Sequence, residues 1–283
     1  MTAGPTQEER DRSFHRIQKY YGGFKEWDRL ERADDGALEF TVNKAWIARF
    51  LPPAGARVLD LGGGPGRYSL WLAEQGYRVT LADLSPDLLE IARQQSKPSG
   101  VDLEAIVEAN ALDLSQFGDA SFDAALCMGP MYHLIDRDDR AQAARELHRV
   151  VKPGATVFVA FLNRLQLLKV AISPEIPFSP ETFEFVKRWL EDGIFISPAL
   201  GLFADAHFVH PQEVSPVMEA AGFKAIDLIS SESLVDAVQK NLVAFKERQP
   251  DLYPWLLEKL IAVANDPSIV GSAGHLLYIG RKR

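Results

Sequence analysis

Short apolar runs alternate with helical patterns along the middle of the chain. The runs are typical of buried strands, and the segments between them place apolar residues three and four positions apart, as one face of a helix requires. Strands that alternate with helices form a parallel sheet covered on both faces. The predicted strands are 57–61, 77–82, 103–108, 124–128 and 155–161.

Helices are predicted before, between and after these strands. Residues 1–12 are expected to be disordered or frayed, and helical patterns follow at 13–24 and 38–50. Ser85-Pro86-Asp87 indicates a helix start, with a capping hydroxyl, a proline at the first helical position and an acid near the positive end of the helix dipole. Further helices are predicted at 68–73, 140–151, 179–191, 211–221 and 231–264, with strands at 223–229 and 275–280.

The stretch Asp60-Leu61-Gly62-Gly63-Gly64-Pro65-Gly66 ends the first predicted strand and leads into a helix. Glycine lets the backbone turn sharply and lets a ligand approach with no Cβ in the way. A helix N-terminus directly after such a turn can hold polar ligand groups. Asp83 ends the next predicted strand, where a carboxylate can accept hydrogen bonds from the ribose hydroxyls of an adenosine. Together these residues predict a cofactor site rather than a plain tight turn.

This stretch resembles the first motif, [D/E]-x-G-x-G-x-G, of the class I S-adenosylmethionine-dependent methyltransferases. The turn Leu-x-Arg-Val-Val-Lys-Pro-Gly-Ala at 147–155 also resembles that family, and the likeness covers about residues 55–163 and returns near the C-terminus. The resemblance implies a mixed α/β, Rossmann-like sheet of seven strands in the order 3-2-1-4-5-7-6, with the last strand antiparallel. It implies S-adenosyl-L-methionine as the cofactor.

The resemblance also implies contacts with the adenosine part of the cofactor. Asp83 would bind the ribose, and Leu84 would cover one face of the adenine. Asn110 and the backbone N–H of Ala111 would meet the adenine edge, although the family often has Asp where this chain has Asn110. Asn110 can instead be a turn residue, because asparagine side chains bond to nearby backbone groups.

The methionine part would lie against the glycine loop, formed by Asp60, Gly62, Gly63, Gly64 and Gly66. Met128 would present its carbonyl to the methionine amino group. Tyr21 either lines the cofactor site, as tyrosines in N-terminal helices of the family often do, or packs one face of an amphipathic helix.

Tyr132 and His133 follow the fourth predicted strand, in the loop that begins at Gly129. Ligands of open α/β sheets bind beyond the carboxyl ends of the strands, so this loop is expected beside the cofactor. Either side chain can take a proton from a hydroxyl, acid or amine acceptor. The alternative for His133 is a hydrogen-bonded structural role.

The predicted chain divides into a helical cap at 1–50, a cofactor-binding core at 51–163, a lid at 164–209 and the rest of the sheet at 210–283, with a helical insertion at 231–264. The lid is rich in Phe and Pro, and its length suggests a cover over the substrate. His207 and His210 would face opposite sides of a strand, and no persuasive metal-ligand spacing is present, so no metal is predicted.

Composition narrows the classes of protein. The 283 residues carry a net charge of -8, which disfavours nucleic acid as a partner. The single cysteine, Cys127, rules out an intrachain disulfide and favours a reducing, cytoplasmic setting. No signal peptide or membrane-spanning run is evident, so no membrane partner is expected, and a homodimer is possible.

The sequence therefore predicts a methyltransferase that acts on a small, partly apolar molecule by in-line displacement. It does not identify the acceptor or the atom methylated. A methyltransferase-like binding or scaffold protein without turnover is an alternative. An NAD-dependent oxidoreductase is a further alternative, but it would require G-x-G-x-x-G where this chain has G-x-G-x-G.

Overall fold

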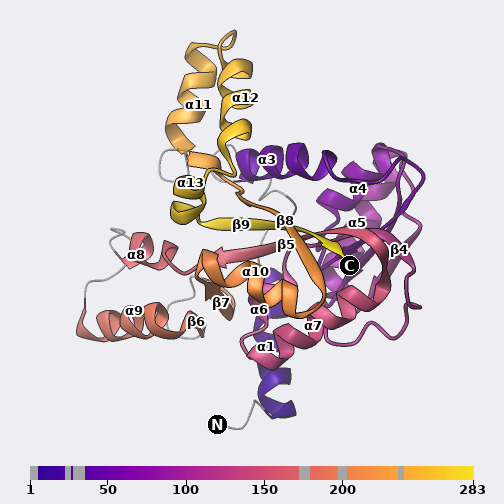
Figure 1. Ribbon diagram of the computed structural model, residues 1–283, viewed down its shortest axis with the longest axis horizontal. Helices are drawn as coiled ribbons and strands as arrows, with labels where there is room; N and C mark the ends of the chain where they lie inside the picture. The colour runs from indigo at the N-terminus through magenta and orange to yellow at the C-terminus, as the bar shows by residue number, and fades with distance from the viewer. Residues whose placement is uncertain (1–5, 23–26, 28–35, 172–178, 197–202, 235–238) are drawn as a thin grey trace.

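A computed structural model describes residues 6–22, 27, 36–171, 179–196, 203–234 and 239–283 (Figure 1). A twisted sheet with helices on both faces forms its centre. The strands are β1 (Arg57–Leu61), β2 (Arg78–Asp83), β3 (Ala105–Glu108), β4 (Phe122–Cys127), β5 (Val151–Asn163), β6 (Ile194–Phe195), β7 (Ala206–Val209), β8 (Phe223–Ser230) and β9 (His275–Lys282).

The main sheet has the predicted Rossmann-like order. β3, β2, β1, β4 and β5 are parallel neighbours, and β9 pairs antiparallel with β5 on one side and with β8 on the other. When the short hairpin of β6 and β7 is left out, β8 and β9 count as the sixth and seventh strands, and the order is 3-2-1-4-5-7-6. The seven-stranded prediction, with its antiparallel last strand, is confirmed.

The short hairpin of β6 and β7 was not predicted. β7 pairs in parallel with the end of β5, at Leu162↔Phe208 and Asn163↔Val209, and β6 pairs antiparallel with β7. β9 already pairs with β5 at Leu162, so β7 must use the other edge of β5, beyond the end of β4. The hairpin therefore lies next to the segment that follows β4.

The helices of the structure mostly match the predicted ones, with differences at their ends. They are α1 (Gln7–Gly22), α3 (Gly36–Ala48), α4 (Arg67–Glu74), α5 (Pro86–Ser99), α6 (Pro130–His133), α7 (Arg137–Val150), α8 (Gln166–Ala171), α9 (Pro180–Asp192), α10 (Pro211–Ala220), α11 (Gln239–Arg248), α12 (Tyr253–Val263) and α13 (Pro267–Ser272). The Ser85 hydroxyl caps α5 as predicted, accepting from the N–H of Leu88 at 3.4 Å.

Three local predictions were wrong. Residues 7–12 are helical rather than frayed, because Thr6 and Glu9 form reciprocal hydrogen bonds that begin α1. The segment that carries Tyr132 and His133 is a helical turn, α6, rather than a loop, with Pro130 at its first position. β5 already begins at Val151, where a turn was expected.

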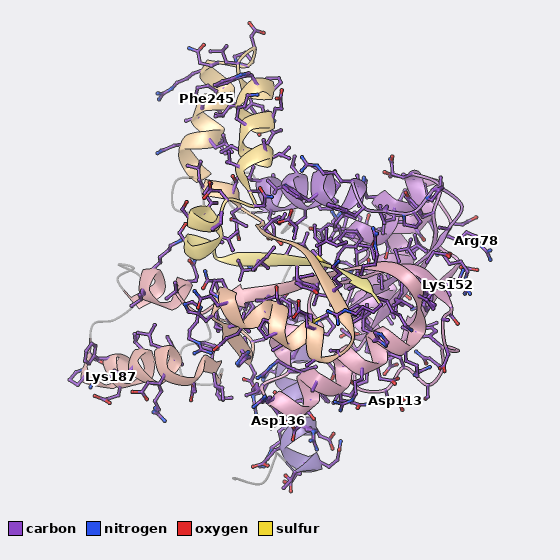
Figure 2. The ribbon with its side chains drawn as sticks, in the orientation of Figure 1. Arg78, Asp113, Asp136, Lys152, Lys187 and Phe245 are labelled. Carbon is purple, nitrogen blue, oxygen red and sulfur yellow. The ribbon has the colours of Figure 1, made fainter. Side chains whose placement is uncertain are left out.

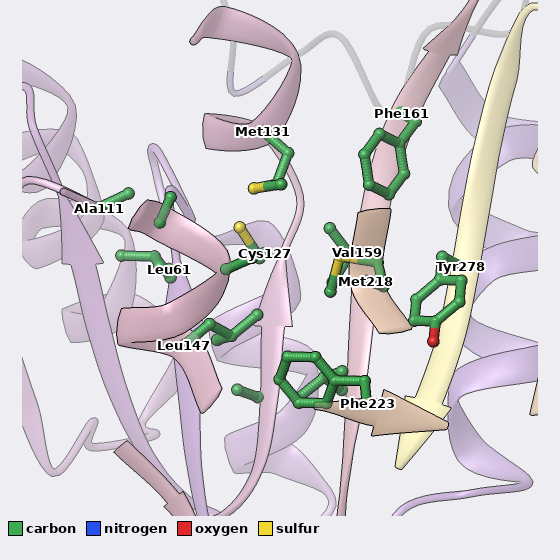
Figure 3. Close-up of a cluster of buried hydrophobic side chains, with 14 of the residues drawn as sticks. Leu61, Ala111, Cys127, Met131, Leu147, Val159, Phe161, Met218, Phe223 and Tyr278 are labelled. Atoms are coloured by element: carbon green, nitrogen blue, oxygen red, sulfur yellow. The ribbon is translucent and has the colours of Figure 1, made fainter. Parts of the chain in front are cut away.

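Two apolar layers flank the sheet, as alternating side chains require. Leu59, Leu61, Ala125 and Cys127 face the layer that contains α6, α7 and α10, part of which Figure 3 shows. Val58, Ala124 and Leu126 face the opposite layer, which contains α3, α4 and α12. Charged side chains such as Arg78 and Asp113 point outward from the molecule, as does Lys187 on α9 (Figure 2).

The predicted helical insertion at 231–264 is seen as α11 and α12, which project from the sheet as a hairpin (Figure 1). Trp46 of α3 ties this hairpin to the core, because its indole N–H donates to the Ile261 carbonyl at 2.9 Å. Within the described part of the chain, no helix combines the length and apolar character needed to cross a membrane.

Candidate functional site

A cavity of about 1120 Å³, counting the space at its mouth, opens beyond the carboxyl ends of β1, β2 and β4. α1 supplies one wall. The side chains and backbone that line the cavity include these predicted site residues: Tyr21, Gly62, Gly63, Gly64, Asp83, Leu84, Asn110, Ala111, Met128, Tyr132 and His133. Of the predicted set, Asp60 and Gly66 are not in the lining. The fold thus brings most of the predicted site residues together.

The glycine loop turns where side chains would not fit. Gly62, Gly64 and Gly66 have φ angles of +69°, +54° and +90°, a region that favours glycine. A Cβ on Gly62 would lie 2.3 Å from Cδ of Pro130, so the loop after β1 and the start of α6 are in close contact. The loop therefore presents bare backbone to the cavity.

Asp83 holds this loop in place. Its carboxylate accepts the Gly64 N–H at 2.8 Å on one oxygen and the Ser85 N–H at 2.8 Å on the other. Burial raises the pKa of Asp83, although these N–H groups act in the opposite direction. Each oxygen keeps a lone pair, so the carboxylate can still accept hydroxyl groups from a ligand in the cavity.

Asp60 lies directly behind the loop. A Cβ on Gly63 would lie 2.6 Å from one of its carboxyl oxygens, and that oxygen accepts the Ser69 hydroxyl at 2.6 Å. The other oxygen has no hydrogen-bond partner among the described residues. Burial raises the pKa of Asp60 to about 6. Asp60 therefore supports the loop from below and adds buried negative charge close to the cavity.

Leu84, Asn110 and Ala111 also line the cavity. The side-chain oxygen of Asn110 accepts the Leu112 N–H at 3.0 Å, so the turn role is present. The Asn110 side chain still borders the cavity, and its amide nitrogen remains a donor. The Leu84 carbonyl accepts from the Gln18 side chain at 2.9 Å, which ties α1 to the end of β2.

His133 lies between two partners from distant parts of the chain. Its Nδ1 is 2.8 Å from the Asp205 carbonyl, and its Nε2 is 2.8 Å from the Tyr21 hydroxyl. A carbonyl only accepts, so these partners assign the proton to Nδ1 and leave Nε2 to accept from the Tyr21 hydroxyl. Burial lowers the pKa of His133 to about 4, so the ring is neutral near pH 7.

Tyr132 has a different arrangement from the one predicted for a proton acceptor. Its hydroxyl donates to the Met128 carbonyl at 3.1 Å, and its ring packs against the His133 ring at a centroid distance of 4.7 Å. The side chain that meets His133 through its hydroxyl is Tyr21, which was predicted to line the cofactor site. The tyrosine–histidine pair thus joins α1 to α6.

Sequence reasoning missed several residues of this site. Gln18 and Glu39 line the cavity, and Asp205 orients His133 from the segment before β7. A polar residue next to an apolar position in an amphipathic helix gives no signal of its own. Asp205 is separated from His133 by α7, β5 and most of the predicted lid, so only the folded chain shows their contact.

The structure also bears on metal binding. His207 is buried in β7, whereas His210 begins α10 as its N-cap, so the two do not meet. Ligand atoms of Glu39, Glu232 and His275 lie within 4.8 Å of one another. Glu232 uses its oxygens on the backbone N–H of His275, at 3.1 Å, and on its ring. These hydrogen bonds account for the grouping of Glu232 with His275 without an ion.

Comparison with known proteins agrees with this geometry. A family model described as "Methyltransferase domain" matches residues 59–159. A ubiquinone biosynthesis O-methyltransferase of Xanthomonas axonopodis pv. citri (strain 306) is 39% identical over 123 residues, which are 44% of this chain and 50% of the relative. The chain thus spans about half the length of the curated relatives it matches.

Solved structures resemble the fold over most of the chain. A SAM-dependent methyltransferase from Methanosarcina mazei has a TM-score of 0.57 at 21% identity, over 84% of this chain and 96% of that one. The 1,6-didemethyltoxoflavin-N1-methyltransferase of Burkholderia thailandensis, with bound 1,6-didemethyltoxoflavin and S-adenosylhomocysteine, has a TM-score of 0.57 at 17% identity, over 100% and 93%. Structural similarity at such low sequence identity shows that these proteins share a fold with this chain.

The order of the sheet, the glycine loop and Asp83 define a class I, Rossmann-like methyltransferase fold. Residues 59–159 match the family model of a methyltransferase domain, which lies within this fold.

Proposed function

We propose that this protein transfers a methyl group from S-adenosyl-L-methionine to a small molecule, and that the acceptor atom gives up a proton in the reaction. The observation that carries the second part is the Tyr21–His133 pair, whose hydroxyl and imidazole meet at 2.8 Å inside the cavity. A neutral imidazole with an unprotonated Nε2 is equipped to accept a proton.

The cavity fits the cofactor on the chemistry of its groups. Asp83 offers carboxylate oxygens for the ribose, beside a loop of bare backbone at Gly62 and Gly64. Leu84 and Asn110 also line the cavity and would border an adenine, and the Met128 carbonyl can accept from an amino group while holding Tyr132. When bound, the cofactor supplies an electrophilic methyl group on a positively charged sulfur.

The residues of the chain then have two tasks, which are positioning and removal of a proton. The acceptor proton would pass to the Tyr21 oxygen as the Tyr21 hydroxyl proton passes to Nε2 of His133. The Asp205 carbonyl holds the Nδ1 proton and so keeps Nε2 directed at Tyr21. Before the transfer, the positive charge in the cavity would be that of the cofactor's sulfur. After the transfer, it would be on the His133 imidazole. Burial disfavours a charge in either position, so it opposes both states alike.

Two observations support a proposal for the nature of the acceptor. Apolar side chains of Phe14, Ile17 and Leu88 contribute to the lining, which supports a partly apolar small molecule. The curated relatives are named as O-methyltransferases, and this supports an oxygen atom as the acceptor. A hydroxyl acceptor also accounts for a site that is built to take up a proton.

The cofactor part is tested by calorimetric titration of S-adenosylmethionine, S-adenosylhomocysteine and NADH into the wild type, Asp83→Asn and a matched control, Asp87→Asn. Asp87 is an exposed acid in the first turn of α5, outside the cavity lining. Loss of a charge-assisted hydrogen bond costs about 1.5–3 kcal/mol, or roughly 10- to 150-fold in Kd. We expect this loss for Asp83→Asn and none for Asp87→Asn.

Binding of NADH in place of the first two ligands would favour the oxidoreductase alternative. Methyl transfer is then tested with labelled cofactor and a panel of small phenols, alcohols, acids and amines. A protein that binds S-adenosylhomocysteine but labels nothing in the panel or in a cell extract supports the alternative of a binding or scaffold protein.

Several finer expectations belong to the same proposal. The cap at 1–50, the core at 51–163, the lid at 164–209 and the remainder at 210–283 are proposed divisions, and cofactor-stabilised fragments from limited proteolysis would test them. A cytoplasmic location, a homodimer and independence from nucleic acid and membranes are also proposed. Light scattering of the purified protein, with and without S-adenosylhomocysteine, tests the dimer.

A further inference from the structure

Asp205 makes contacts from both its side chain and its backbone. The carboxylate is fully buried and accepts from the Ser13 hydroxyl at 2.9 Å and from Nε of Arg16 at 2.8 Å, with a second, shorter contact to the same guanidinium. The backbone carbonyl of the same residue accepts from Nδ1 of His133. One residue therefore joins the segment before β7 to both α1 and α6.

These contacts bear on both members of the proposed proton-accepting pair. Ser13 and Arg16 belong to α1, which also carries Tyr21. Through its carboxylate, Asp205 fixes the position of α1 and so the position of the Tyr21 hydroxyl. Through its carbonyl, it fixes the tautomer and the ring orientation of His133.

We infer that Asp205 is a positioning residue, which aligns the Tyr21 hydroxyl with Nε2 of His133 by holding α1 with its carboxylate and the imidazole with its carbonyl. This inference rests on the proposed function, in which the pair accepts the acceptor proton. Asp205 acts through these two residues and has no place in the cavity lining itself.

Because the Asp205 carboxylate is buried, the ion pair between Arg16 and Asp205 is sensitive to the loss of either partner. The Arg16 side chain is about one-third exposed, whereas the Asp205 carboxylate is shielded from water. Breaking a buried pair from one side leaves an uncompensated charge, and the structure relieves that charge by admitting water. Here the water would enter between α1 and His133.

A second ion pair of α1 provides a matched control. Nε of Arg10 donates to both carboxylate oxygens of Asp139, at 2.8 and 3.0 Å, and so ties α1 to α7. The hydrogen bonds of this pair are separate from those of Tyr21 and His133, although Arg10 and Asp139 line one hollow with His133. Arg10→Gln removes an arginine from the same helix by the same substitution as Arg16→Gln, without exposing the Asp205 carboxylate.

The experiment follows the imidazole of His133 by NMR in the wild type, Arg16→Gln, Arg16→Lys, Asp205→Asn and Arg10→Gln. Tyr21, Tyr132 and Asp205 contact the ring. The charged residues that line a hollow together with His133 are Glu9, Arg10, Arg12, Arg16, Asp136 and Asp139. Two quantities are measured, the pKa of His133 and exchange of its Nδ1 proton with water. S-adenosylhomocysteine binding is measured on the same samples.

We expect Arg16→Gln to raise the pKa of His133 from about 4 towards its ordinary value, because the ring gains water and the charge of the Asp205 carboxylate is no longer balanced by Arg16. Asp205→Asn should speed exchange of the Nδ1 proton at least tenfold. Arg16→Lys should restore much of both properties, because it retains the positive charge. Arg10→Gln should leave both unchanged.

Equal changes in Arg10→Gln and Arg16→Gln would overturn the inference, since they would reflect general loosening of α1. Unchanged His133 behaviour in folded Arg16→Gln would overturn it as well, and this variant decides the question if Asp205→Asn does not fold. Failure of the wild type to bind S-adenosylhomocysteine would count against the proposed function instead, whatever the His133 titration shows.

Discussion

The contact between the glycine loop and α6 can be tested by comparing two alanine substitutions, Gly62→Ala and Gly64→Ala. Both glycines have positive φ angles, +69° and +54°. Their surroundings differ. A Cβ on Gly62 would lie 2.3 Å from Cδ of Pro130, whereas the nearest atom to a Cβ on Gly64 is Cδ1 of Leu88 at 3.7 Å.

The expected loss of stability follows from the positive φ angle and from the contact that the added Cβ makes. A left-handed backbone costs a residue with a Cβ about 1–2 kcal/mol, and both variants bear that cost. Gly62→Ala must also push the ring of Pro130 away, and overpacking of this kind costs about 1–3 kcal/mol. We therefore expect a loss of about 2–5 kcal/mol of unfolding free energy for Gly62→Ala and about 1–2 kcal/mol for Gly64→Ala.

Urea unfolding of the two variants and the wild type measures these losses, with S-adenosylhomocysteine titration on the same samples. Displacement of Pro130 moves the start of α6, so Gly62→Ala should also change the NMR signals of the His133 ring, which Gly64→Ala should leave alone. Equal losses of stability in the two variants would refute the reasoning, because they would show that the contact with Pro130 carries no cost.

Three further predictions concern single buried groups. The contribution of Asp60 to the free energy of unfolding of the wild type should fall by about 3 kcal/mol as the pH rises from about 4 to about 6, because the pKa of Asp60 is raised by burial and its protonated form favours folding. Asp60→Asn should lack this contribution. Parallel curves of unfolding free energy against pH for the two proteins would contradict the prediction. The contribution of His133 to the free energy of unfolding of the wild type should fall by about 3 kcal/mol as the pH drops from about 6.5 to about 4, since the lowered pKa of His133 makes its protonation favour the unfolded chain. His133→Gln should lack this contribution, and urea unfolding of both proteins at each pH measures the difference. Tyr278→Phe should raise the unfolding free energy by about 1 kcal/mol, because the buried Tyr278 hydroxyl has no hydrogen-bond partner among the described residues; a lower midpoint in urea would show that the hydroxyl is satisfied.

The core of the fold could be predicted because each of its strands carries a local signal. The apolar run that ends at Leu61 is followed by glycines, and the run that ends at Ala82 is followed by Asp83, so strand ends and ligand groups coincide. The start of α1 had a signal as well. Thr6-Gln7-Glu8-Glu9 has the spacing of a capping box, which the structure confirms through the bonds between Thr6 and Glu9.

The proposed proton-accepting pair could be predicted only in part. His133 was found from its position after β4, and Tyr21 from its helix, but nothing in the sequence shows that they meet. Their contact depends on where α1 packs, and the buried carboxylate of Asp205 is one of the groups that hold α1 in place. A single acid in a segment of irregular pattern gives no local signal. Long-range hydrogen bonds of this kind lie beyond periodicity and spacing.

The position of β9 has a consequence for synthesis of the protein. β9 is an interior strand that lies between β5 and β8, yet α8 to α13 are all made between β5 and β9. One edge of the apolar strand β5 therefore stays open on the ribosome until β9 has emerged. An open edge of this kind can pair with another chain. The nascent protein should therefore depend most on chaperones late in translation, after its cofactor-binding half is already complete.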